Sequence, residues 1–335
     1  MPEDGLPDCA LPERTLPERA FGRLAIVGLG LIGSSIARAA RANGLAGTIV
    51  AIDRDAGVIE RVRALGLAEE ATQDVAAGVA GADLVILCVP VGAAGTVAAA
   101  MAGALKPGAI VSDVGSVKAA VVAAVAPHLP PHAAFVPAHP VAGTEQSGPD
   151  AGFATLFQGR WCILTPPEGA DPQAVARVRA FWEGMGSVVE IMTPAHHDLV
   201  LAITSHVPHL IAYNIVGTAA DLETVTQSEV IKFSAGGFRD FTRIAASDPT
   251  MWRDVFLTNK DAVLEMLGRF NEDLAALARA IRWDDGEALH ALFTRTRAIR
   301  RGIVAMGQET AEPDFGRRGP ASPGTAPPPL AGREP

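Results

Sequence analysis

The sequence predicts two successive domains, an α/β domain with a mostly parallel sheet and then an all-α domain. From Arg23 to about Met192, short apolar runs alternate with helical segments, which is typical of a doubly wound parallel sheet. From about Pro194 onward, apolar residues recur at helical spacing and no convincing strand is found. A length of 335 residues leaves room for two domains, each with its own core.

Each predicted element has its own apolar pattern. The strands of the first domain (22–192) are the runs RLAIVGLG, TIVAIDR, DLVILCVP, AIVSDVGS, HAAFVPAHP, WCILTPP and SVVEIMTP. In the second domain (193–311), the helical spacing is carried by Leu199, Ile203, Val207, Leu210, Ile211 and Ile215, and again by Val263, Met266, Leu267, Phe270, Leu274 and Leu277. Residues 1–21 are expected to form a loose leader. Residues 312–335 are rich in Pro and Gly and are expected to be a disordered tail.

Composition narrows the class of protein. The chain is 49% hydrophobic and 19% charged, which is typical of a globular protein. A net charge of -9 argues against a nucleic-acid partner, because binding to a phosphate backbone needs clustered Lys and Arg. The three cysteines, Cys9, Cys88 and Cys162, have no metal-ligand spacing. Cys88 and Cys162 lie in apolar strand-like runs and are interpreted as buried thiols in a reducing cytoplasm.

A membrane partner is not expected either. The N-terminus shows no secretory signal. The uncharged run from Leu84 to Leu105 is long enough to cross a bilayer, but Pro90, Gly92 and Gly95 interrupt it. A strand, a turn and a helix fit that run better.

A glycine loop follows the first predicted strand. Gly28, Gly30 and Gly33 form GxGxxG between an apolar strand and an apolar helix, with Leu29, Leu31 and Ile32 as the intervening residues. In that context the first glycine permits a tight turn, the second lets the backbone approach a pyrophosphate, and the third packs helix on strand. The free N–H groups at the helix N-terminus favour phosphate. A Rossmann-type dinucleotide-binding domain is therefore predicted.

The second predicted strand ends in a carboxylate suited to a ribose. Asp53 comes 20 residues after Gly33 and could accept hydrogen bonds from the adenosine ribose of NAD. Arg54 follows at once and could serve the 2′-phosphate of NADP, so NADP stays possible. Val89 and Pro90 are candidate wall residues of the cofactor crevice, although packing explains them nearly as well.

Two further strand ends carry reactive side chains. Ser116 ends one strand in a Gly-Ser turn, where it could also cap the next helix, and His139 stands in a Pro-x-His-Pro corner after another. The carboxyl edge of an open parallel sheet is where ligands bind. An imidazole at that edge, outside any helix, favours acid–base chemistry over a structural role.

Five motifs together resemble the prephenate/arogenate (cyclohexadienyl) dehydrogenase family of tyrosine biosynthesis. They are GLGLIGSS, DVGSVK, HPVAGTEQSG, HHDLVLAITSHVPH and GGFRDFTRIAASDPTMWRD, and the resemblance runs from about Arg23 to Met306. It implies oxidative decarboxylation of prephenate, of arogenate or of both, with hydride transfer to NAD. It also implies a homodimer built by the helical domain. No mutase or regulatory segment is recognised beside the two domains, so a monofunctional form is expected.

The resemblance also implies site residues. His139 would be the general base for the substrate 4-hydroxyl, and Ser116 would fix the geometry. Arg243 would receive a substrate carboxylate, with a surface salt bridge to Asp240 or Asp248 as its structural alternative. The remaining candidates for the substrate pocket are His209, Thr144, Glu145, Trp252 and Asp240.

The histidine pair in SHVPH leaves a metal site as a rival interpretation. His206 and His209 have helix-face spacing, but Pro208 distorts that turn and the usual third ligand is missing, so no metal is predicted. His206 is expected to be buried and structural. Two other functions stay open: a β-hydroxyacid-type dehydrogenase, whose catalytic lysine motif is not found, and a dinucleotide-sensing protein without turnover.

Overall fold

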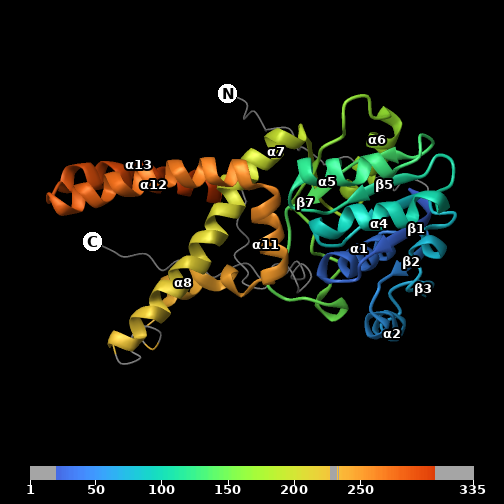
Figure 1. Ribbon diagram of the computed structural model, residues 1–335, viewed down its shortest axis with the longest axis horizontal. Coiled ribbons are helices and arrows are strands. Elements are labelled where there is room, and N and C mark those ends of the chain that lie inside the picture. The colour runs from blue at the N-terminus through green and yellow to red at the C-terminus, as the bar shows by residue number, and fades with distance from the viewer. Residues whose placement is uncertain (1–19, 227–231, 233, 306–335) are drawn as a thin grey trace, which may run out of the picture.

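The computed structural model describes residues 20–226, 232 and 234–305, and shows an α/β body joined to a set of long helices (Figure 1). Nearly all of the expected leader and all of the expected tail lie outside the described residues. The last strand of the body ends at Ile191, and the first helix of the other part begins at Pro194.

A six-stranded parallel sheet forms the centre of the α/β body. Its order is β3-β2-β1-β4-β5-β6, so the chain starts in the middle and winds outward in both directions. The strands are β1 (Phe21–Val27), β2 (Ala46–Ile52), β3 (Glu70–Thr72), β4 (Leu84–Leu87), β5 (Ile110–Asp113) and β6 (Ala134–Phe135). Alternate residues of β1 pack into different clusters, Leu24 and Ile26 into one and Ala25 and Val27 into the other, because both faces of the sheet are covered.

Helices supply that cover. They are α1 (Leu31–Ala42), α2 (Ala56–Ala64), α3 (Val75–Val79), α4 (Ala94–Met101), α5 (Lys118–Val125) and α6 (Pro172–Gly184), with short turns η1 (Val91–Ala93), η2 (Ala102–Ala104), η3 (Ala126–His128) and η4 (Pro149–Ala151). The run from Leu84 to Leu105 contains β4, η1, α4 and η2, as predicted.

A second sheet was not expected from the sequence. The predicted strand HAAFVPAHP is two strands, β6 in the large sheet and β7 (Ala138–Pro140) in a three-stranded sheet with β8 (Trp161–Leu164) and β9 (Val188–Ile191). β7 runs antiparallel to β8, while β8 and β9 are parallel. Pro137 lies at the break, and its missing N–H cannot continue a strand ladder. The strand β3 was also missed, because three residues are too few to show a period.

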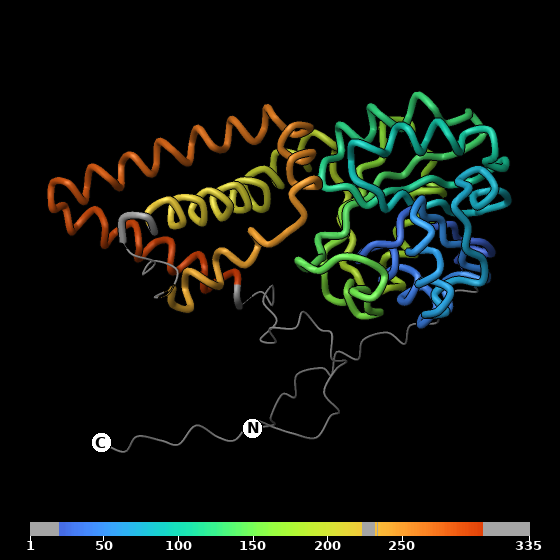
Figure 2. The backbone as a smooth tube through the Cα atoms, turned by 60° about the horizontal axis from the view of Figure 1, so that its bottom comes forward, coloured from blue at the N-terminus to red at the C-terminus, as the bar shows by residue number. Residues whose placement is uncertain are grey.

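The second part is helical, as predicted, and contains no strand within its described residues. It comprises α7 (Pro194–Leu201), the π-helical turn η5 (Ala202–His206), α8 (Val207–Thr226), α10 (Gly236–Thr242), η6 (Arg243–Ala246), α11 (Pro249–Thr258), α12 (Lys260–Arg282) and α13 (Gly286–Ala305). Both views show α12 and α13 as an antiparallel pair that projects far from the sheets (Figures 1 and 2). α11 lies between this arm and the α/β body.

Much apolar surface of the helical part is exposed. The helical run Pro194–Leu222 is long and apolar enough to cross a bilayer. Its most apolar 18-residue stretch has a mean hydropathy of 1.5, and only 28% of that stretch is buried. Fourteen of the eighteen exposed large hydrophobic side chains lie from Leu199 onward, Leu274 and Trp283 among them. This part of the molecule therefore has faces that its own described residues leave uncovered.

Candidate active site

The glycine loop has the backbone geometry of a dinucleotide site. Gly28 has a φ of 98°, and a Cβ there would stand 2.4 Å from the carbonyl oxygen of Cys88. A Cβ on Gly33 would be 2.0 Å from the carbonyl oxygen of Gly28, so helix α1 packs directly on the loop. At Gly30, in contrast, nothing lies within 4 Å of the missing Cβ, which leaves the open approach that a pyrophosphate needs. The residues present therefore fit a dinucleotide.

Asp53 lies against the same loop. Its Oδ2 accepts a hydrogen bond from the backbone N–H of Leu29 at 2.9 Å, and its Oδ1 accepts one from Asp55 at 3.0 Å. The carboxylate thus stands where β2 ends, next to the glycine turn. Val89 also borders the turn, because its Cγ1 would be 3.2 Å from a Cβ on Gly28, whereas Pro90 is exposed. Leu31 and Ile32 begin helix α1 beside them.

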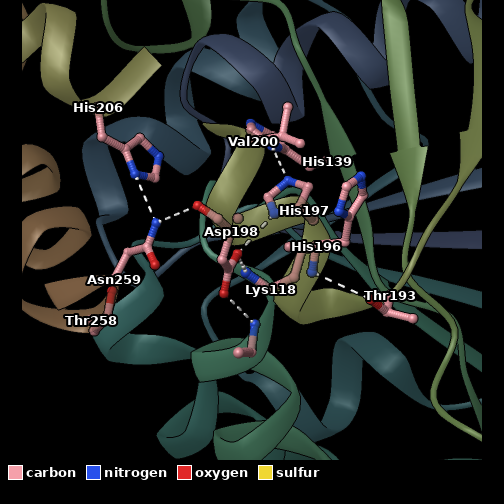
Figure 3. A network of polar contacts seen from close by, with 12 residues as sticks. Lys118, His139, Thr193, His196, His197, Asp198, Val200, His206, Thr258 and Asn259 are labelled. Carbon is pink, nitrogen blue, oxygen red and sulfur yellow. Dashed lines mark hydrogen bonds and ion pairs between the residues drawn. The ribbon is translucent and has the colours of Figure 1, made fainter. Parts of the chain in front are cut away.

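His139 is buried in the short strand β7, with 7% of its surface exposed. The sequence predicts a Pro-x-His-Pro corner at the end of a strand, and the structure places His139 within β7, which pairs with β8 and sets His139 opposite Ile163. Its Nδ1 lies 2.8 Å from Nε2 of His197, and His197 Nδ1 lies 2.8 Å from Oδ1 of Asp198 (Figure 3). The candidate base is therefore held through one ring nitrogen by residues of helix α7.

Asp198 joins this set of side chains to the start of helix α5. Its Oδ1 accepts the backbone N–H of Lys118 at 2.7 Å and its Oδ2 accepts that of Ala119 at 2.9 Å. The alternative role of Ser116 as a helix cap is therefore wrong, because Val117 is the N-cap residue and Asp198 satisfies the free N–H groups from outside the helix. The hydroxyl of Ser116 has no hydrogen-bond partner among the described residues.

A buried ion pair fixes the residue before His139. Lys118 Nζ is paired with Asp113, and it also donates to the carbonyl oxygen of Ala138 at 2.7 Å. Asp113 Oδ1 accepts the N–H of the same Ala138 at 3.2 Å. One charged pair at the end of β5 thus binds both the N–H and the carbonyl oxygen of Ala138, which restrains β7 directly before His139.

Burial keeps His139 neutral near neutral pH. Burial is the main cause that holds the pKa of His139 well below its ordinary value, and the charges of His197, Lys118 and His206 lower it further. A neutral imidazole can accept a proton, whereas an imidazolium cannot.

Arg243 lies at the start of η6 and contacts the loop that follows β7. Its Nη1 is 3.3 Å from Oε2 of Glu145, so one partner of Arg243 is an acid of the other domain. Thr144, beside it, accepts the N–H of Gln146 at 3.2 Å through Oγ1. Asp240 is an exposed residue of α10, and Asp248, the other proposed partner, caps α11 by accepting the N–H of Met251.

His209 and Trp252 form a stacked pair near the same arginine. Their ring centroids are 3.6 Å apart with an interplanar angle of 23°, and His209 Nδ1 donates to the carbonyl oxygen of Ser205 at 2.8 Å. Burial lowers the pKa of His209, and the charge of Arg243 lowers it further. Trp252 is 6% exposed and packs against Val117, next to Ser116.

His206 takes part in a buried hydrogen bond with Asn259. Its Nδ1 accepts from Nδ2 of Asn259 at 3.1 Å, and the same amide donates to the carbonyl oxygen of Asp198 at 2.8 Å (Figure 3). The ring is fully buried, as expected for a structural residue. Within the described residues, no group of three or more His, Cys, Asp or Glu side chains could hold a metal ion.

Sequence reasoning missed four polar residues that surround His139. Asp113, Lys118, His197 and Asp198 all lie inside motifs that were recognised, yet none was assigned a role. The signal was present in part, since a lysine in an apolar helix and a His-Asp pair after a helix-capping Thr are both unusual in a buried segment. What the sequence lacks is the packing of α7 against α5, which brings the two motifs together.

Comparison with known proteins assigns both parts of the chain. Residues 36–191 match the model of the prephenate dehydrogenase nucleotide-binding domain, and residues 193–295 match that of the prephenate dehydrogenase dimerization domain. The chain is 47% identical over 270 residues to a cyclohexadienyl dehydrogenase of Zymomonas mobilis, covering 81% of this chain and 92% of that protein. It is 33% identical over 282 residues to a prephenate dehydrogenase of Bacillus subtilis, covering 84% and 76%.

Solved structures agree with these relatives. A prephenate dehydrogenase from Aquifex aeolicus, in complex with hydroxyphenyl propionate and NAD+, superposes with a TM-score of 0.79 at 35% identity, covering 84% of this chain and 98% of that one. An arogenate dehydrogenase of Synechocystis gives a TM-score of 0.70 at 29% identity, covering 84% and 99%. With both domains matched and a relative nearly half identical over most of its length, the chain belongs to the prephenate dehydrogenase family.

Proposed function

We propose that this chain catalyses the oxidative decarboxylation of prephenate, of arogenate or of both, in tyrosine biosynthesis, and that His139 is its general base. The observation that carries the role of His139 is a buried imidazole, bound at Nδ1 to His197, in a chain of this family. Its lowered pKa keeps the ring able to accept a proton near neutral pH.

In the reaction, the substrate 4-hydroxyl loses its proton while a hydride leaves the carbon that bears this hydroxyl. His139 would take the proton of the 4-hydroxyl, and the Ser116 hydroxyl would hydrogen-bond the imidazole or the substrate oxygen. NAD, when bound, supplies the hydride acceptor. The loss of carbon dioxide from the ring then gives an aromatic product, which drives the reaction forward.

The substrate carries two carboxylates, so its site must include cationic and donor groups. Arg243 is the proposed partner of one carboxylate, because a guanidinium offers two parallel N–H donors. His209, Trp252 and Thr144 would complete the pocket, with Glu145 and Asp240 holding Arg243 and shaping access. Support comes from the stacked His209–Trp252 pair near Arg243 and from the contact of Arg243 with Glu145.

The cofactor is NAD, and its proposed contacts lie at the glycine loop. Gly28, Gly30, Gly33 and the N-terminus of α1 would hold the pyrophosphate, and Asp53 would accept hydrogen bonds from the ribose. The bond from Leu29 N–H to Asp53 supports this, because it places the carboxylate at the loop. Arg54 keeps NADP as a second possibility.

We propose that the protein is a cytoplasmic homodimer. Within each chain, we place the boundary between the two domains near residue 192. The match to a dimerization domain and the exposed apolar side chains of the helical part support the pairing of two chains there. Exposed apolar faces of this size are unusual on a monomer.

Steady-state rates test the function directly. Initial rates of NADH formation would be measured with prephenate and with arogenate, each with NAD and with NADP. Turnover of at least one of the two substrates is expected, with NAD preferred. A protein that binds NAD but turns over neither substrate would instead fit the dinucleotide-sensing alternative.

A further inference from the structure

The contact between His139 and His197 is one part of a longer chain of hydrogen bonds. Starting from helix α5, the backbone N–H groups of Lys118 and Ala119 meet Asp198, Asp198 meets His197, and His197 meets His139 (Figure 3). His197 is fully buried and Asp198 is 5% exposed, so water does not compete for these contacts.

The direction of each hydrogen bond follows from its neighbour. Both oxygens of Asp198 accept backbone N–H groups, and the positive end of the α5 dipole lies beside them, so both oxygens act as hydrogen-bond acceptors. His197 Nδ1 must therefore carry the proton that it shares with Asp198 Oδ1. In a neutral His197 ring this leaves Nε2 without a proton, as an acceptor.

The same logic fixes His139. Since His197 Nε2 accepts, the hydrogen between the two rings belongs to His139 Nδ1. A neutral His139 then has its lone pair on Nε2, the nitrogen that this chain of contacts does not use. The free nitrogen is thus the basic one, which a general base requires.

We propose that His197 is a positioning residue, which holds His139 in the tautomer with a proton on Nδ1 and a lone pair on Nε2. This inference rests on the proposed role of His139 as the base. In the reaction, the substrate O–H bond breaks and an N–H bond forms at His139 Nε2. The imidazolium so formed keeps its Nδ1–H on His197, whose other nitrogen remains on the Asp198 carboxylate.

Other charged groups face this pair and set its electrostatics. Lys118 and His206 oppose a positive charge on His139, while Asp113 and Asp198 favour one on His197. Asp198 is the acid in direct contact with His197, and its two backbone donors come from α5. A substitution at His197 therefore tests the hydrogen bonds that run from Asp198 through His197 to His139. A substitution at Asp198 would also remove the acceptor that caps helix α5.

The tautomer of His139 can be measured by NMR, without an assay of turnover. Two-bond ¹H–¹⁵N correlation spectra of histidine-labelled, NAD-bound native protein at about pH 8 distinguish a protonated from an unprotonated ring nitrogen, and the His139 signals are those lost in His139→Asn. A protonated Nδ1 and an unprotonated Nε2 are expected for His139. The opposite tautomer in the native protein would overturn the proposal, and this measurement stands even if a variant fails to fold.

His197→Phe then tests the consequence. Phenylalanine fills the space but neither accepts from His139 nor donates to Asp198, so the tautomer of His139 is expected to lose its single form. We expect kcat to fall roughly 10- to 100-fold, the usual effect of losing an orienting partner, with little change in the Kd of NAD. His196→Phe is the matched control, because its exposed ring precedes His197 and lies outside the chain of contacts. It should leave both the tautomer and kcat unchanged.

The outcomes separate this proposal from the function itself. If His197→Phe keeps the native tautomer and a near-native kcat, His197 is merely a packed residue. If native protein shows the expected tautomer but turns over neither substrate, the hydrogen-bond relay holds and the assigned reaction is wrong.

Discussion

The Nη1 of Arg243 and the Oε2 of Glu145 lie 3.3 Å apart and join the helical domain to the loop after β7. Their side chains are 45% and 34% exposed, so the pair is open to solvent. Exposed pairs of this kind contribute about 0–1 kcal/mol to stability. We propose that Arg243 is placed there to bind an anionic ligand.

Replacing Arg243 with Ala should therefore weaken substrate binding more than folding. A carboxylate that loses a charged hydrogen-bond partner loses about 1.5–3 kcal/mol. That corresponds to roughly a 10- to 150-fold rise in KM, with a smaller change in kcat. Steady-state kinetics on native and Arg243→Ala protein measure this effect.

Two further variants sharpen that test. Arg243→Lys should rescue KM only in part, because an ammonium keeps the charge but not the planar fork. Arg239→Ala, an exposed arginine in α10, should leave KM unchanged. An unaltered KM together with a collapse of thermal stability in Arg243→Ala would show that the arginine is structural.

His139→Asn should lower kcat by roughly 10²–10⁴-fold, the range for a lost general base, with little effect on NAD affinity. His128→Asn, in the exposed turn η3, is the control. Because burial holds the pKa of His139 below its ordinary value of 6.5, the acid limb of the native kcat profile should lie below pH 6.5. A near-native kcat in His139→Asn would show that His139 has a structural role and is not the general base.

Much of the fold could be predicted because it rests on local patterns. The strand β1, the glycine turn and helix α1 are adjacent in sequence, and each has the period or residue that its conformation needs. The split of HAAFVPAHP between two sheets could not be predicted, because it depends on the pairing of β7 with β8 more than twenty residues later. An apolar run does not say which partner it will meet.

The candidate site divides in the same way. His139, Ser116 and Arg243 were found because their motifs resemble a family, while His197 and Asp198 stand in a quoted motif without an assigned role. Their contacts come from α7 lying against α5, two helices that are about eighty residues apart in sequence. Hydrogen bonds at that separation are set by tertiary packing, which a single sequence does not display.

Asp53→Ser should weaken NAD binding and narrow the preference for NAD over NADP. Serine removes a charged acceptor from the ribose and a repelling charge from a 2′-phosphate. It also removes the carboxylate that Leu29 N–H contacts, so the loop itself should loosen. The measurement is the ratio of kcat/KM with the two cofactors, and an unchanged ratio would show that Asp53 is not at the ribose.

The protein should be a homodimer at micromolar concentration, joined through its helical domain. The exposed apolar side chains of α12, such as Leu274, need cover that one copy does not provide among its described residues. Light scattering should give twice the chain mass, and Leu274→Glu should shift the protein toward the monomer. Val188→Glu, an exposed position of β9, is the control. A native protein that scatters as a monomer would contradict this pairing.

His206 should make the fold sensitive to acid. Burial is the main cause that lowers the pKa of His206 from 6.5 to about 4. The charges of His197 and His209 also lower this pKa, whereas the charge of Asp198 raises it. Below pH 6.5 the unfolded chain therefore binds a proton that the folded chain resists, so the free energy of unfolding falls as the pH drops toward 4. The shift corresponds to at most about 3 kcal/mol for this residue.

His206→Gln keeps an acceptor for Asn259 but cannot titrate. As the pH falls from 6.5 to 4, the free energy of unfolding of the variant should therefore fall less than that of the native protein. Denaturant unfolding at a series of pH values measures it, and parallel curves for the two proteins would show that His206 does not titrate on unfolding.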